Sequence, residues 1–217
     1  SDILKNANIT TFAPSKAASK LESSKLFTKE ICDSCQAPTA GYDYFDNKEK
    51  AIEFIKKSKF PIVVKADGLA AGKGVVIASE YLKAKETITE MFGGHYGQAG
   101  NQVVIEEFME GEEASLFVLC DGENLISFGG AQDHKRAFDG DNGPNTGGMG
   151  AYSPTPVLTK EIEKKAISKI IKPCLSEMRK RGIPYEGVLY AGLMIKDGEP
   201  KLVEFNTRFG DPECQVL

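Results

Sequence analysis

Apolar residues along the chain recur with two different periods, which predict a mixture of strands and helices. Short apolar runs typical of buried strands occur at 61–66, 75–78 and 103–107. Apolar positions spaced for one face of a helix follow a capping residue, Asp46 or Asn47, and run to about Lys57. A second helix is predicted from Ser79 to about Phe92. Strands and helices are therefore mixed along the chain.

Turn signals predict that most strands pair as antiparallel hairpins. Strands expected at 113–120 and 124–131 flank Asp121-Gly122, and strands at 186–196 and 200–207 flank Asp197-Gly198. The remaining expected elements are a helix at 15–34, a short strand at 39–45, a polar glycine-rich loop at 132–150, and a long helix from Thr159 or Lys160 to Lys180 that is interrupted at Pro173. Hairpins mixed with helices indicate an α+β fold rather than a doubly wound parallel sheet.

Composition narrows the classes of function. The 217 residues are 41% hydrophobic, and the net charge of −4 argues against a nucleic-acid binder. No apolar stretch is long enough to span a bilayer, and the first residues do not resemble a secretory signal. The chain starts without Met, so we expect it to be a piece of a longer protein.

Five scattered cysteines indicate reduced thiols and a cytosolic location. Cys32 and Cys35 form a C-x-x-C motif, but no second pair completes a zinc site. A redox motif favours a helix N-terminus, whereas this pair falls near the end of a predicted helix.

A loop of small residues, Asp67 to Gly74, joins two expected strands. Three residues separate Gly68 from Gly72 and no Ser or Thr follows Lys73, so the loop is not a P-loop. It also lacks the third glycine of a dinucleotide fingerprint. Glycines allow backbone N–H groups to approach an anion closely, and Lys65 lies on the strand before the loop. The pattern favours a polyphosphate site over a simple hairpin with a solvated lysine.

Near the C-terminus, the alternation of a strand places Glu204, Asn206 and Arg208 on one face. Carboxylate and amide oxygens are hard ligands that suit Mg²⁺ together with phosphate oxygens. An arginine two residues further along can hold an anionic group through two hydrogen bonds. A solvated polar strand face is the alternative explanation.

The segment from Gln132 to Arg136 places donors and acceptors directly after an apolar strand. Lys135 and Arg136 are candidate phosphate ligands, although a run of charges is usually a solvated surface. His134 fits a structural or exposed role at least as well as a catalytic one.

Several strings together resemble the phosphoribosylamine–glycine ligases of the ATP-grasp superfamily. They are VVKADGLAAGKGVVIA (63–78), VVIEEFMEGEEAS (103–115), AQDHKR (131–136), GPNTGGMGAYSP (143–154), LYAGLMI (189–195) and VEFNTRFGDPE (203–213). The resemblance implies two subdomains with mainly antiparallel sheets that clamp ATP. It divides the chain into an N-terminal segment and helix packed on the large subdomain (1–38), a small subdomain with the phosphate loop (39–110), and a large subdomain with the metal and substrate site (111–217).

The resemblance also implies roles for individual residues. Lys25 and Lys65 resemble lysines that contact ATP phosphates, Glu113 resembles the ligand of the ribose hydroxyls, and residues 106–109 resemble the linker that meets the adenine. The full set implied to bind ATP is Lys25, Lys65, Gly72, Lys73, Gly74, Glu106, Glu107, Phe108, Met109, Glu113, Arg136 and Asn145.

The remaining implied residues concern the reaction itself. Glu204 and Asn206 resemble the Mg²⁺ ligands, with Mn²⁺ as an alternative metal. The residues implied to be catalytic are Arg136, Asn145 and Arg208, and those implied to form the substrate pocket are Asp133, Lys135, Arg208 and Asp211. The expected strand at 187–195 carries no further metal-binding acid, which leaves the number of metal ions open.

The implied reaction joins glycine to 5-phosphoribosylamine through a glycyl phosphate and yields glycinamide ribonucleotide, ADP and phosphate in purine synthesis. The implied partners are N- and C-terminal domains of the same polypeptide, which either stands alone or belongs to a longer multifunctional chain with further purine-pathway domains. No nucleic acid or membrane is implied, and this piece alone is expected to be inactive or impaired. The alternatives are another ATP-grasp carboxylate–amine ligase or carboxylase, and a non-catalytic nucleotide-binding fragment.

Overall fold

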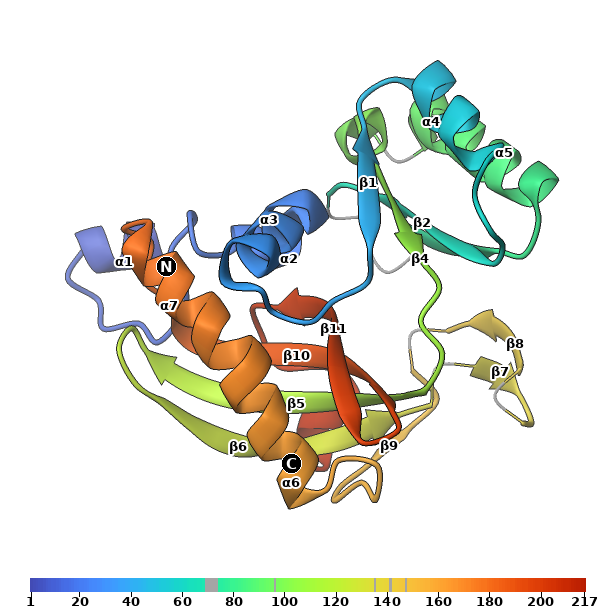
Figure 1. Cartoon of the computed structure of the whole chain (residues 1–217). Helices are drawn as coiled ribbons and strands as arrows, with labels where there is room; N and C mark the ends of the chain where they lie inside the picture. Colours follow the sequence, from blue (N-terminus) through green and yellow to red (C-terminus); the bar gives the residue numbers. More distant parts are fainter. Residues whose placement is uncertain (69–73, 96, 135, 141, 147) are drawn as a thin grey trace. The chain divides into compact units, whose positions relative to one another are not determined.

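The computed structural model describes residues 1–68, 74–95, 97–134, 136–140, 142–146 and 148–217, and it divides into two compact units (Figure 1). Unit 1 comprises Ser1–Leu21, Glu30–Thr39 and Glu110–Leu217, and unit 2 comprises Glu22–Lys29 and Ala40–Met109. This division differs from the expected boundaries at residues 22–29. Backbone N–H groups of Lys25 and Leu26 donate to the carboxylate of Asp67, which ties this segment to unit 2.

Unit 2 is built on a four-stranded antiparallel sheet with the strand order β1-β4-β2-β3. The predicted strands before and after the glycine-rich loop are present and pair as a hairpin. The elements of this unit are β1 (Tyr42–Phe45), α4 (Lys48–Ile55), β2 (Ile62–Ala66), β3 (Val75–Ala78), α5 (Tyr81–Glu90), the π-helical turn η1 (Met91–His95), the 3-10 turn η2 (Gly97–Asn101) and β4 (Val103–Glu107).

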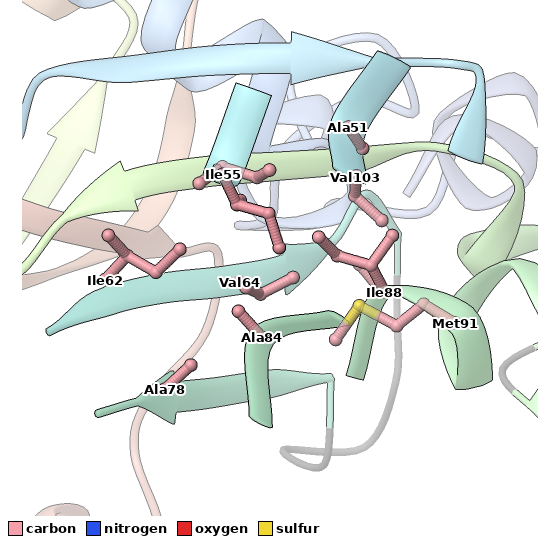
Figure 2. Packing of buried hydrophobic residues seen from close by; sticks show 11 residues of the cluster. Ala51, Ile55, Ile62, Val64, Ala78, Ala84, Ile88, Met91 and Val103 are labelled. Atoms are coloured by element: carbon pink, nitrogen blue, oxygen red, sulfur yellow. The ribbon is translucent and has the colours of Figure 1, made fainter. Parts of the chain in front are cut away.

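One face of this sheet is apolar and is covered by α4 and α5 (Figure 2). Alternation along β2 turns Ile62, Val64 and Ala66 toward the two helices and leaves Val63 and Lys65 on the opposite face. The buried cluster consists of Ala51, Ile55, Ile62, Val64, Ala66, Ala78, Ala84, Ile88, Met91, Val103 and Ile105. Because the core occupies one face only, the other face is available for charged side chains.

A hydrogen bond at the start of α4 shows which residue is its N-cap. The side chain of Asn47 accepts a hydrogen bond of 2.9 Å from the backbone N–H of Lys50, so Asn47 and not Asp46 is the N-cap.

Unit 1 contains a five-stranded antiparallel sheet with the order β11-β10-β5-β6-β9. Together the two sheets confirm the predicted α+β class. The elements are α1 (Asp2–Asn6), β5 (Glu112–Asp121), β6 (Leu125–Asp133), β7 (Arg136–Phe138), β8 (Asn142–Asn145), β9 (Ala151–Tyr152), α6 (Lys160–Ala166), the π-helical turn η3 (Ile167–Ile171), α7 (Lys172–Lys180), β10 (Glu186–Lys196), β11 (Glu199–Asn206) and the 3-10 turn η4 (Glu213–Gln215). Two further helices, α2 (Lys20–Ser23) and α3 (Lys25–Cys35), contribute residues to both units.

The prediction of a structureless loop at 132–150 is wrong in part. Strands β7 and β8 pair within it, with Arg136 opposite Asn145, and β9 pairs with the end of β6. Gly140 lies between β7 and β8 with φ of 71°, a conformation that glycine adopts without steric cost. The hairpin was not predicted because its polar, glycine-rich sequence lacks the apolar alternation that indicates most strands.

The predicted long helix runs from α6 through η3 to α7, with the side chain of Thr159 capping its start. The predicted interruption takes the form of the π-helical turn, which directly precedes the helical turn that contains Pro173. Proline cannot donate a backbone hydrogen bond to the preceding turn, and a wider turn accommodates that loss while the helix continues.

The core of unit 2 can be tested at one helix. Ile88→Ala removes most of a fully buried side chain of α5 and is expected to lower the free energy of unfolding by about 2–5 kcal/mol. Leu82→Ala on the same helix changes a side chain that is 69% exposed, so we expect a change below about 0.5 kcal/mol. Urea unfolding followed by circular dichroism measures both, and equal losses would contradict the packing described.

Candidate functional site

The face of the unit 2 sheet opposite its core carries a buried carboxylate that pairs with two lysines. Glu106 of β4 accepts from the Nζ of Lys65 at 2.8 Å and lies 3.3 Å from the Nζ of Lys29. The strand register explains the first contact, because Glu106 lies opposite Val63 and therefore shares a face with Lys65 two residues further along β2. The second lysine comes from α3, so one carboxylate joins two strands and a helix.

All three charged side chains are almost completely buried, with 3–5% of each exposed. Lys29 also donates to the backbone carbonyl of Ala40 at 3.0 Å and lies over the ring of Tyr42. Two ammonium groups and one carboxylate together carry a single positive charge. This electrostatic arrangement favours a nearby anion.

Asp67 fixes the base of the glycine-rich loop to the start of α3. Its carboxylate accepts from the hydroxyl of Ser24 and from the backbone N–H groups of Lys25 and Leu26, at 3.1, 2.5 and 3.2 Å. The Nζ of Lys25 donates to the carbonyl of Gly68 at 3.1 Å. The capping carboxylate thereby holds the predicted phosphate lysine against the first residues of the loop.

The far end of that loop is anchored to the sheet. The backbone N–H of Ala66 donates to the carbonyl of Gly74 at 2.8 Å, so the loop begins and ends beside paired strands. Gly72 and Lys73, two of the predicted nucleotide residues, lie outside the described residues.

The predicted adenine-binding segment, residues 106–109, begins within β4 and continues beyond its end at Glu107. The backbone of Glu107 donates to the carbonyl of Gly41 at 2.9 Å, and its carboxylate accepts from the N–H of Gly41 at 3.1 Å. Phe108 follows with 37% of its surface exposed. These contacts hold the segment in an extended course as it leaves the sheet.

In unit 1, Glu204, Asn206 and Arg208 contact one another in series along one face of β11 and its extension. The amide Nδ2 of Asn206 donates to Oε1 of Glu204, and an Nη2 of Arg208 donates to Oδ1 of Asn206, each at 3.4 Å. Arg208 also donates to the carbonyl of Phe209 at 3.0 Å. The carboxylate of Glu204 therefore lies beside the amide nitrogen of Asn206, and the amide oxygen of Asn206 faces the guanidinium group of Arg208.

The residues of β10 that lie opposite the candidate metal ligands show whether this strand can supply a further ligand. Gly192 of β10 lies opposite Glu204, and Tyr190 lies opposite Asn206. Within the described part of the chain, no group of three or more His, Cys, Asp or Glu side chains is placed to hold a metal ion. A metal at this face would therefore depend on one carboxylate, one amide and ligands from elsewhere, as suits an ion bound together with phosphates.

The other candidate residues of unit 1 lie on several strands. Asp133 ends β6 opposite Ala151, and Arg136 pairs with Asn145 across the β7–β8 hairpin. Glu113 lies on β5 opposite Met194, and Asp211 accepts from the side-chain amide of Gln215 at 2.9 Å. His134 stacks on Tyr152, which supports the structural role weighed for it. Lys135 lies outside the described residues.

Two buried charged residues of these regions were not singled out from the sequence. Lys29 lies one helical turn after Lys25, and this spacing is a signal that could have placed both lysines on one face. Glu213 is 2% exposed and accepts from the hydroxyl of Ser115 at 3.2 Å. No local pattern indicates Glu213, because its partner lies on a distant strand.

Comparison with known proteins identifies the family of the chain. The profile of a family described as "Phosphoribosylglycinamide synthetase, ATP-grasp (A) domain" matches residues 23–214. The chain belongs to this family.

Relatives in the family share high sequence identity with the chain. A protein of Mesorhizobium japonicum named phosphoribosylamine–glycine ligase is 55% identical over 216 residues, and one of Arabidopsis thaliana, named as the chloroplastic form, is 57% identical over 219. All of this chain is covered, but only 51% and 41% of these relatives. The chain therefore spans about half the length of the curated relatives it matches, or less.

Solved structures show the same fold. A phosphoribosylamine–glycine ligase of Thermotoga maritima superposes with a TM-score of 0.89 at 37% identity, covering 99% of this chain and 54% of that one. A biotin carboxylase of Campylobacter jejuni superposes with a TM-score of 0.76 at 17% identity, covering 98% of this chain and 46% of that one, which shows the ATP-grasp fold alone.

In the described residues, no helix has the length and apolarity needed to cross a membrane.

The buried pairing at Glu106 can be tested by an isosteric change. Glu106→Gln leaves two buried ammonium groups without their carboxylate, so we expect the free energy of unfolding to fall by about 3–5 kcal/mol. Glu107→Gln, the matched control, changes an exposed neighbour whose amide oxygen can still accept from Gly41. We expect the control to change stability by less than about 0.5 kcal/mol in urea unfolding.

A second variant separates charge from packing. Adding Lys29→Met to Glu106→Gln removes one unpaired ammonium group at similar volume and should recover part of the lost stability. A further loss of the same size would mean that the lysine contributes through packing and not through its charge.

Proposed function

We propose that the chain supplies the nucleotide-binding and carboxylate-activating part of a phosphoribosylamine–glycine ligase. The whole protein would join glycine to 5-phosphoribosylamine with ATP and yield glycinamide ribonucleotide, ADP and phosphate in purine synthesis. The observation that carries this proposal is the family match across residues 23–214, together with relatives above 50% identity that bear this enzyme's name.

The chemistry proceeds in two balanced steps. A carboxylate oxygen of glycine attacks the γ-phosphorus of ATP, the bond to the β-phosphate oxygen breaks, and ADP leaves. The amine nitrogen of phosphoribosylamine then attacks the carbonyl carbon of glycyl phosphate, the carbon–oxygen bond to phosphate breaks, and the nitrogen loses a proton. A free carboxylate is a poor acyl donor, and the first step supplies its leaving group. Catalysis then rests on positioning and on neutralising charge.

Unit 2 carries the residues proposed to hold the nucleotide. Lys65 and Lys25 are proposed to contact the phosphates, and both are held by acidic partners, Glu106 and Asp67. Since the carboxylate of Glu106 accepts from lysines, we propose that its backbone, with Glu107, Phe108 and Met109, meets the adenine. Gly72, Lys73 and Gly74 complete the proposed phosphate loop, and Glu113 of unit 1 is proposed for the ribose.

Unit 1 carries the residues proposed for the metal and the acceptor. ATP-grasp enzymes generally use a divalent metal with ATP, and a carboxylate and an amide oxygen, which Glu204 and Asn206 of β11 can supply, are ligands that suit a hard ion such as Mg²⁺ or Mn²⁺. Bound there, the metal would neutralise phosphate charge. The proposed phosphate-neutralising residues are Arg136, Asn145 and Arg208, and the proposed substrate residues are Asp133, Lys135, Arg208 and Asp211.

The wider setting of the chain is also proposed from its relatives. We infer that the parent polypeptide also has N- and C-terminal domains, of which the first helps to form the phosphoribosylamine site, and that it either stands alone or belongs to a multifunctional chain with further purine-pathway domains. A cytosolic location stays a prediction, and the relative from Arabidopsis thaliana is named as chloroplastic.

The proposal is tested by ADP release from the full-length protein with ATP, Mg²⁺, glycine and freshly generated phosphoribosylamine, omitting each component in turn. We expect turnover only when all four are present. Bicarbonate or formate replacing glycine would reveal a carboxylase or another ATP-grasp ligase. Nucleotide binding without any turnover would indicate a non-catalytic nucleotide-binding protein.

The metal assignment has its own prediction. Glu204→Ala in the full-length protein removes the proposed carboxylate ligand and is expected to abolish turnover and weaken Mn²⁺ binding measured by electron paramagnetic resonance in the presence of ATP. Glu199→Gln changes an exposed acid on the same strand, whose pKa Lys165 and Lys169 lower to about 2, and should leave both properties unchanged. Circular dichroism checks that both variants fold, and an active Glu204→Ala protein refutes the metal role.

A further inference from the structure

Three thiols from two helices of unit 1 meet in one cluster. Cys32 and Cys35 lie at the end of α3, and Cys174 lies on α7. The sulfur atoms of Cys35 and Cys174 are 3.7 Å apart, and the thiol of Cys32 also hydrogen-bonds with that of Cys174. The C-x-x-C motif therefore gains a third thiol from a residue 139 positions away in sequence.

The two closest thiols of this cluster differ in access and acidity. Cys35 is partly exposed, and the hydrogen bond with Cys174 lowers the pKa of its thiol to about 7. Cys174 is fully buried, and hydrogen bonds with Cys32 and Cys35, together with burial, raise the pKa of its thiol. One sulfur is therefore reachable and more acidic than an ordinary thiol, and the other lies buried beside it and is less acidic. This is the arrangement of an attacking and a resolving cysteine.

We propose that Cys35 and Cys174 form a site of reversible thiol oxidation, in which a hydroperoxide converts the pair into a disulfide that links α3 to α7. A disulfide places its sulfur atoms about 2.05 Å apart, and the two sulfurs start at 3.7 Å. Bond formation therefore requires the two sulfurs, which belong to one compact unit, to approach by about 1.7 Å.

The oxidation balances with hydrogen peroxide as the oxidant. The Cys35 thiolate attacks one peroxide oxygen, the O–O bond breaks, and hydroxide leaves to become water, which produces a sulfenic acid. The sulfur of Cys174 then attacks the sulfur of Cys35, the S–O bond breaks, and the hydroxide leaves with the thiol proton as a second water. The two thiols lose two electrons in total and the peroxide gains them. A small dithiol reverses the reaction by thiol–disulfide exchange.

The other cysteines provide internal comparisons. Cys32 is fully buried, so a peroxide reaches it less readily than Cys35. Burial raises the pKa of Cys120 to about 12, which keeps it protonated and unreactive. Cys214 is exposed, and its thiol donates to the side chain of Gln215. Exposure alone therefore does not distinguish Cys35 from Cys214. The neighbouring thiol of Cys174 distinguishes them, because it lies beside Cys35.

Peptide mapping tests the proposed pairing. The chain is treated with hydrogen peroxide, remaining thiols are alkylated, and trypsin digestion without reductant is followed by mass spectrometry. We expect peptide 30–48, which contains Cys32 and Cys35, to be joined to peptide 170–179, which contains Cys174, with the loss of two hydrogen masses. Cys35→Ala should abolish this product, while Cys32→Ala and Cys214→Ala should retain it.

Three outcomes would overturn the proposal. They are a disulfide within peptide 30–48, persistence of the linked product in Cys35→Ala, and oxidation of Cys35 that stops at sulfinic acid with Cys174 unchanged. Circular dichroism establishes that each variant is folded before oxidation.

A rate measurement on the reduced protein gives a second test. Cys174→Ala removes the hydrogen bond that contributes most to lowering the pKa of Cys35 to about 7, and a full return to the ordinary value of 9.0 sets the upper limit of the effect. At pH 7 the thiolate fraction should fall roughly fiftyfold, while the more basic thiolate becomes roughly eightfold more nucleophilic. Iodoacetamide should therefore alkylate Cys35 roughly sixfold more slowly, with Cys214 as the reference thiol in the same sample. An unchanged rate would contradict the role given to Cys174.

Discussion

Burying the carboxylate of Glu106 in unit 2 is tolerable only because Lys65 and Lys29 meet it from two other elements. An unpaired charge in such a place costs several kcal/mol, so each partner constrains the others. The pairing joins β4 and β2, and it draws the first half of α3 into unit 2. This explains why residues 22–29 group with a sheet that follows them in sequence. The carboxylate also sets the position of a lysine beside the glycine-rich loop. The carboxylate of Glu106 thus both neutralises buried lysine charge and positions a lysine for the proposed binding of phosphate.

In unit 1, the geometry of the strands places the proposed metal ligands. Alternation along β11 brings Glu204 and Asn206 to one face, and the opposite residue to Glu204 on β10 is Gly192, whose backbone lies against the Cγ of Glu204. The proposed metal ligands therefore need no loop to position them. Sites built on paired strands hold their side chains more precisely than sites on loops.

Much of the fold could be predicted because its signals are local. The strands at 62–66 and 103–107 and the hairpins around Asp121-Gly122 and Asp197-Gly198 follow from apolar periodicity and turn residues. The shared face of Glu204 and Asn206 follows from alternation alone.

The features that could not be predicted from the sequence depend on contacts between residues that are distant along the chain. The partnership of Lys29 with Glu106, the cap that Asp67 provides for α3 and the meeting of Cys35 with Cys174 join residues that no local pattern connects. The β7–β8 hairpin was missed for a related reason, because backbone pairing and glycine conformations hold it together without an apolar face. The motifs of the family resemblance indicate the proposed function, but they carry no information on these contacts.

We propose above all that the full-length protein activates the carboxylate of glycine by phosphorylating it. The most direct measurement supplies the full-length protein with glycine labelled with oxygen-18 in its carboxylate, together with ATP, Mg²⁺ and phosphoribosylamine, and analyses the released phosphate by mass spectrometry. Transfer through glycyl phosphate predicts that each phosphate carries one labelled oxygen from glycine. Phosphate released without label, while glycinamide ribonucleotide forms, would contradict the account.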